Sequence, residues 1–121
     1  MSVKIVHAAD FHLDSAFGAL SAEQARQRRR ESRELLARLA QFVNEQKADI
    51  VLLAGDLFDS DTTYRETLEA LSEALGAMQA RVFIAPGNHD PYSAKSPYAT
   101  LSWPENVHIF TSKTVERVDV R

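Results

Sequence analysis

The chain contains no cysteine. Disulfide bonds and thiolate metal sites are therefore excluded, and a reducing compartment is the simpler expectation. Long apolar runs are also missing, since none approaches the length of a membrane span. The first residues, MSVKIVHAADFHL, lack the apolar core and cleavage site typical of a signal peptide. We therefore expect a cytoplasmic protein that does not contact a membrane.

Neither sign of charge dominates the chain, whose formal net charge is -3 over 121 residues. This mild acidity argues against a generally basic surface for nucleic acids, although a local basic patch is compatible with it. The length and the 45% hydrophobic content suffice for one small domain with a core.

Three segments have the composition of short buried strands. Val3–Ala9, Ile50–Ala54 and Arg81–Ala85 are apolar and rich in β-branched residues. We expect Val51 and Leu53 to share one face of the sheet with Phe83 and Ala85, and the opposite face to be apolar as well. A sheet that is apolar on both faces needs cover on both.

Two helices alternate with these strands. Ser21 and Gln24 form a plausible capping box, and the apolar stripe that follows predicts a helix to about Gln46. A second capping box at Thr63 begins a helix that should end near Ala80. The order strand, helix, strand, helix, strand predicts an α/β fold, a parallel βαβαβ sheet with right-handed crossovers.

The last part of the chain predicts a short hairpin. Val107–Phe110 and Thr114–Val120 read as two strands joined by a tight turn, and the second alternates apolar and charged residues.

A polar cluster follows each of the three parallel strands. Because the carboxyl ends of parallel strands meet at one edge of a sheet, we expect the clusters to converge. They are Asp10 with His12, Asp56 with Asp59, and Asn88 with His89 and Asp90.

Carboxylates gathered in this way need a cation. Two like charges about 4 Å apart repel by about 4 kcal/mol at an effective dielectric of 20, which a bound metal ion would offset. Oxygen and imidazole donors without sulfur suit manganese, iron, zinc or magnesium. Taken singly, Asp10, His12 and Asn88 could be ordinary loop or turn residues. Taken together, the three clusters favour a metal crevice.

Three signatures resemble those of a known family. Asp10-x-His12, Gly55-Asp56-x-x-Asp59 and Gly87-Asn88-His89-Asp90 resemble the first three signatures of the calcineurin-like metallophosphoesterases. More narrowly, HAADFHLDSAF, LLAGDLFDSD, APGNHDPY and WPENVHIF resemble the SbcD-like and YhaO-like DNA repair exonucleases. The resemblance covers essentially the whole chain.

The resemblance implies a role for each matching residue. Asp10 and His12 would bind a first metal ion, Asp56 would bridge two ions, and Asn88 would bind the second. His89 would act on the leaving group, with Asp59 orienting it. The resemblance also implies two divalent ions, manganese in the nuclease branch, a DNA substrate and an ATPase partner.

The implied fold is a two-sheet αββα sandwich, of which residues 1–121 would be the N-terminal part. Later histidine signatures of the family are absent, since the last histidine is His108. We therefore expect the second half of the domain to be missing, one ion or none to bind, and the chain to be inactive alone. We also expect it to self-associate through an uncovered sheet face.

Three functions are compatible with these motifs. The first is phosphodiester hydrolysis of the DNA exonuclease type in the complete enzyme. The second keeps the metal chemistry but acts on a phosphomonoester or cyclic nucleotide. The third is an assembly or regulatory module that retains the fold without a working site.

A run of arginines lies near the start of the first helix. Arg26, Arg30 and Arg33 are candidates for contacts to DNA phosphates. The simpler interpretation is a solvated helix face in which arginines pair with Glu23, Glu31 and Glu34 at helical spacing.

Overall fold

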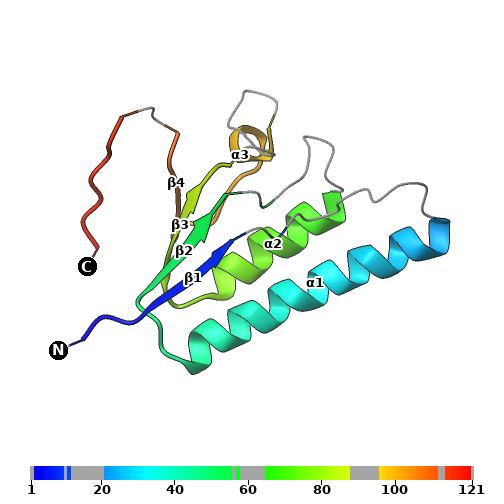
Figure 1. Ribbon diagram of the computed structural model, residues 1–121, viewed down its shortest axis with the longest axis horizontal. Helices are drawn as coiled ribbons and strands as arrows, with labels where there is room; N and C mark the ends of the chain where they lie inside the picture. Colours follow the sequence, from blue (N-terminus) through cyan, green and yellow to red (C-terminus); the bar gives the residue numbers. More distant parts are fainter. Residues whose placement is uncertain are drawn as a thin grey trace.

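The computed structural model describes residues 2–9, 11, 21–55, 57, 65–87, 96–111 and 114–120. Its elements are β1 (Ile5–Ala9), α1 (Ala22–Glu45), β2 (Ile50–Ala54), α2 (Arg65–Ala77), β3 (Arg81–Ala85), α3 (Pro97–Thr100) and β4 (Val107–Ile109). Figure 1 shows the strands side by side in one sheet, with α1 and α2 along one of its faces.

The sheet has four parallel strands in the order β1-β2-β3-β4. The predicted parallel βαβαβ arrangement is therefore confirmed. The register places Val51 opposite Val82 and Leu52 opposite Phe83. The expectation that Phe83 shares a face with Val51 is wrong, because β3 pairs one residue out of step with the expected register.

The predicted hairpin is also wrong. β4 pairs in parallel with β3, through hydrogen bonds from Val82 N to Asn106 O at 2.8 Å and from Phe110 N to Ile84 O at 2.9 Å. Residues 114–120 form no strand.

The core lies between the sheet and the two long helices. Val51, Leu53, Val82 and Ile84 point into it and are fully buried. They meet apolar side chains from the inner faces of α1 and α2, which include Leu36, Val43, Leu71, Leu75 and Met78. Helical spacing of apolar residues places these side chains on one stripe of each helix.

The ends of the helices agree with the sequence to within a few residues. Ser21 caps α1 in a capping box with Gln24, as predicted. α2 ends at Ala77, before the expected Ala80, because Asn106 donates hydrogen bonds to the carbonyl groups of Leu75, Met78 and Ala80 and turns the chain there. The predicted cap of α2 at Thr63 lies outside the described residues.

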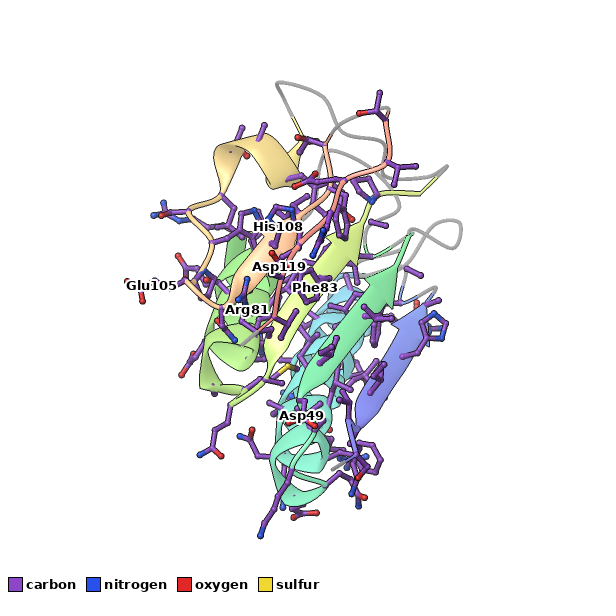
Figure 2. All side chains as sticks on the ribbon, turned by 90° about the vertical axis from the view of Figure 1, so that its left-hand side faces the viewer. Asp49, Arg81, Phe83, Glu105, His108 and Asp119 are labelled. Atoms are coloured by element: carbon purple, nitrogen blue, oxygen red, sulfur yellow. The ribbon has the colours of Figure 1, made fainter. Side chains whose placement is uncertain are left out.

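The opposite face of the sheet is covered only in part. Around Phe83, which is 6% exposed, lie His108, Phe110 and Arg81 (Figure 2). Residues 114–120 pass over this side of the sheet, and Glu116 Oε1 lies 2.8 Å from His108 Nε2. On the β1 and β2 side, Ile5 and Leu52 are 52% and 36% exposed. One half of this face is therefore apolar and open to solvent.

A candidate metal centre at the strand ends

The three motif-bearing strands end level with one another. In the register, Ala9 pairs with Ala54, and Ala54 pairs with Ala85. Neighbouring strands lie about 4.8 Å apart, so β1 and β3 end within about 10 Å of each other. In the sequence, Asp10 directly follows β1, Asp56 comes two residues after β2, and Asn88 comes three residues after β3. The chain therefore enters all three polar clusters from one rim of the sheet.

The backbone segments that directly follow β2 and β3 approach each other closely. Gly55 has a φ of +73°, a backbone conformation that residues other than glycine rarely adopt. A Cβ atom added to Gly55 would lie 3.1 Å from Gly87 Cα. Both glycines precede a predicted metal ligand, Asp56 after the first and Asn88 after the second. The two glycines thus allow these loops to start in direct contact.

One apolar side chain shortly after β1 and one shortly after β2 pack against the core. Leu57, between the two predicted carboxylates of its motif, is fully buried in the core. Phe11, between Asp10 and His12, is partly buried and packs against the same core. Sequence reasoning missed the burial of Leu57. The signal was available, because in each motif a polar residue alternates with an apolar one.

All of the predicted ligands and catalytic residues lie outside the described residues. They are Asp10, His12, Asp56, Asn88, His89 and Asp59. Within the part of the chain that the structure describes, no group of three or more His, Asp or Glu side chains could hold a metal ion. The described part of the rim is compatible with the expected metal centre, because β1, β2 and β3 all end at this edge of the sheet. Gly55 and Gly87 allow the backbones that follow β2 and β3 to approach each other closely.

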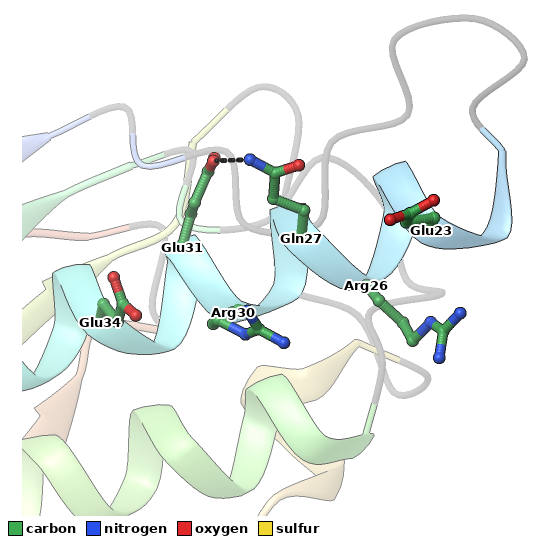
Figure 3. A pocket seen from close by; sticks show the side chains of 6 residues that line it. All are labelled: Glu23, Arg26, Gln27, Arg30, Glu31 and Glu34. Atoms are coloured by element: carbon green, nitrogen blue, oxygen red, sulfur yellow. Dashed lines mark hydrogen bonds between the residues drawn. The ribbon is translucent and has the colours of Figure 1, made fainter.

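The candidate arginines lie on the first half of α1. Arg26 and Arg30 are exposed, and Arg33 is half-buried beside the groove between α1 and α2. The predicted pairing with glutamate is not formed by Arg26 or Arg30 among the described residues. Glu31 instead accepts a hydrogen bond from Gln27 Nε2 at 3.3 Å (Figure 3).

The other histidines and aromatic residues have structural surroundings. His7 is exposed, because β1 presents that side chain to the open face of the sheet. Trp103 stacks on Tyr98, with ring centroids 6.2 Å apart, and its Nε1 donates to Tyr98 O at 3.3 Å. Trp103 therefore has a packing role.

No described helix combines the length and the apolar character needed to cross a lipid bilayer.

Comparison with known proteins gives the same family as the motifs. The calcineurin-like phosphoesterase family matches residues 3–119. The uncharacterized metallophosphoesterase YhaO of Bacillus subtilis is 36% identical over 117 residues, which cover 92% of this chain and 28% of that protein. The SbcD subunit of the SbcCD nuclease from the same organism is 25% identical, over 98% of this chain and 30% of that protein.

A third relative is the SbcD subunit of the SbcCD nuclease from Rhodobacter capsulatus. It is 32% identical over 105 residues, which cover 82% of this chain and 24% of that protein. The chain thus spans less than a third of the length of each of these relatives. The family match extends over nearly the whole chain, and the chain belongs to the calcineurin-like phosphoesterases.

Proposed function

We propose that the complete protein hydrolyses phosphodiester bonds of DNA at a centre of two divalent metal ions, as an exonuclease. The observation that carries the proposal is the shared rim, where β1, β2 and β3 end level and Gly55 meets Gly87. The names of two relatives, both nuclease subunits, support a nucleic acid substrate. Manganese is the proposed metal, and DNA repair is the proposed context.

Each motif residue has a place in this proposal. Asp10, His12, Asp56 and Asn88 would hold the ions, with Asp56 shared between them. Bound ions of this kind supply a nucleophile at neutral pH and neutralise charge on the phosphoryl group. His89 would donate a proton to the leaving oxygen, and Asp59 would accept a hydrogen bond from His89 and hold its ring in place. Leu57 and Phe11 would keep the loops in position through the core.

The complete protein would have further parts and partners. Because two relatives are named as subunits of a nuclease, we propose that an ATPase is its partner. Residues 1–121 alone would bind one ion or none and would not catalyse. The exposed apolar half of the sheet face would drive self-association of this part.

A second candidate is hydrolysis of a phosphomonoester or cyclic nucleotide. It is favoured by the relative YhaO, which is 36% identical and whose name specifies a metallophosphoesterase without a substrate. The third candidate is an assembly or regulatory module that retains the fold without activity.

A hydrolysis assay discriminates among these functions. The complete protein with Mn²⁺ is offered bis(p-nitrophenyl) phosphate, p-nitrophenyl phosphate and end-labelled DNA. The proposal predicts hydrolysis of the diester and of DNA, with Asp56→Asn reducing both by more than about 100-fold. Asp119→Asn, the same change on an exposed segment, serves as the control and leaves both rates unaltered. Hydrolysis of the monoester alone would favour the second candidate, and no hydrolysis would favour the third.

A further inference from the structure

We infer that the buried hydroxyl of Thr67, in the first turn of α2, positions the segment that carries Asp56 when metal ions bind at the strand rim. In that state the hydroxyl forms a hydrogen bond with the backbone of this segment. The inference rests on the proposed function and adds a positioning residue to it.

Thr67 is a polar residue on the apolar stripe of α2. It is 0% exposed, as are Leu71 and Leu75, which follow it at a spacing of four residues. Residues at this spacing share one side of a helix. Thr67 therefore faces the sheet, as the two leucines do.

The hydroxyl of Thr67 has no hydrogen-bond partner among the described residues. A threonine inside a helix commonly donates to a carbonyl group about one turn earlier. For Thr67 that turn precedes Arg65, where α2 begins, so α2 itself offers no such carbonyl. A buried hydroxyl without a partner destabilises a fold, and valine would fill the same space without this cost. Packing alone therefore does not explain a threonine at this position.

The place of Thr67 along α2 is level with the strand rim. Asn106 fixes the other end of α2 beside the start of β3, because its Nδ2 donates to Leu75 O and its O accepts from Val82 N, both at 2.8 Å. From Leu75 back to Thr67 the helix rises by about 12 Å, and four residues of a strand cover about 13 Å. Thr67 is therefore level with residues 85–86, where β3 ends. Figure 1 shows α2 running back along the sheet from the end toward which the strands point.

Leu57 indicates which segment beyond the strands lies nearest to this hydroxyl. It is 0% exposed and belongs to the same core cluster as the apolar stripe of α2. The other described residues just beyond β2 and β3 are only half-buried; they are Gly55, Pro86 and Gly87. The segment that follows β2 thus enters the interior of the rim, on the side that α2 covers with Thr67.

Asp56 directly precedes Leu57 and is the residue proposed to be shared by both metal ions. A hydrogen bond from the Thr67 hydroxyl to this backbone would hold the Asp56 carboxylate in the orientation that binds metal. Hydrogen bonds that orient a ligand in this way contribute to metal affinity. Because the bond forms when metal binds, its loss weakens metal binding without weakening the metal-free fold.

Two substitutions separate this role from packing. Thr67→Val keeps the shape of the side chain and removes the hydroxyl, whereas Thr67→Ser keeps the hydroxyl and removes a methyl group. Calorimetry measures the Mn²⁺ affinity of the complete protein, and thermal unfolding in EDTA measures the stability of the metal-free form.

The two variants should have opposite effects. We expect Thr67→Val to weaken Mn²⁺ binding by about 10-fold or more, with an unfolding temperature in EDTA equal to or above that of the unaltered protein. Thr67→Ser should retain the Mn²⁺ affinity and unfold at a lower temperature, because a buried methyl group is lost.

Two results would overturn the inference alone. One is an equal Mn²⁺ affinity in Thr67→Val and the unaltered protein. The other is an affinity that follows stability, so that Thr67→Ser binds Mn²⁺ less tightly than Thr67→Val. An unaltered protein that binds no Mn²⁺ would contradict the proposed function, and this inference with it.

Discussion

At Gly55 the backbone takes a conformation that few residues other than glycine adopt, at the point where the chain leaves β2 for the carboxylate motif. Gly55→Ala should destabilise the protein by about 1–2 kcal/mol, because alanine is strained at this φ and its Cβ would lie 3.1 Å from Gly87 Cα. Denaturant unfolding measures the loss. Gly76→Ala, in α2, is the matched control. Its Cβ would lie 3.3 Å from a proline side chain, so we expect a smaller change, within about 1 kcal/mol. Equal stability of Gly55→Ala and the unaltered protein would contradict this interpretation.

Leu57 is buried in the core and directly follows Asp56, a predicted metal ligand. It is 0% exposed, so Leu57→Ala should cost about 2–5 kcal/mol of unfolding free energy. Leu57→Met conserves volume and should cost less than about 1.5 kcal/mol. If Leu57 positions the Asp56 loop, Leu57→Met should still weaken Mn²⁺ binding measured by calorimetry.

The control for this prediction is Leu35→Ala on α1. Leu35 is 46% exposed and lies outside the core cluster, so its loss should alter stability little and Mn²⁺ affinity not at all. Equal metal affinity in Leu57→Met and the unaltered protein would show that Leu57 contributes to the core alone.

Among the elements, the end of α2 is held by two side-chain amides, those of Asn44 and Asn106. Asn106 Nδ2 donates to the carbonyl groups of Leu75, Met78 and Ala80 at 2.8, 3.2 and 3.1 Å. Asn106→Asp replaces this donor by an acceptor that faces three carbonyl oxygens, and should cost about 1–3 kcal/mol. Gln41→Glu makes the same chemical change on an exposed part of α1, at a cost of about 0.5 kcal/mol beside Glu45. Thermal unfolding that fails to separate the two variants would contradict this role of Asn106.

Sequence patterns predicted the elements that local rules determine. Ser21 and Gln24 formed their capping box, and the apolar stripes placed α1 and α2 within a few residues. Patterns within a segment say little about its partners in space. The alternation at residues 114–120 therefore predicted the second strand of a hairpin, which the structure does not contain among its described residues. For the same reason, the register that places Val51 and Phe83 on opposite faces of the sheet could not be obtained from either strand alone.

In the candidate site, too, the features that follow from local sequence rules could be predicted, and those that depend on packing between segments could not. The rim was predictable, because parallel strands necessarily end at a common edge. The contact of Gly55 with Gly87 and the burial of Leu57 were not, since both depend on how neighbouring loops and helices pack. The ligand roles of Asp10, His12, Asp56 and Asn88 stay predictions.

On the scale of the whole molecule, the sheet has one face packed by helices and another that is apolar and half covered. Ile5 and Leu52 are exposed on the uncovered half. Residues 1–121 should therefore self-associate with rising concentration in light-scattering measurements. Leu52→Glu should reduce this association. Val115→Glu introduces the same charge at a residue that is fully exposed but lies outside the sheet, and should have little effect. A monomer at all concentrations would contradict the prediction.

The proposed metal centre and the proposed phosphodiesterase activity both depend on the shared rim of β1, β2 and β3. The most direct test of this shared rim is anomalous X-ray scattering at the manganese edge from crystals of the complete protein soaked in Mn²⁺. We expect manganese peaks within bonding distance of Asp10, Asp56 and Asn88 together. Manganese that is absent from the rim, or that contacts one of these residues while the other two point elsewhere, would contradict a shared centre.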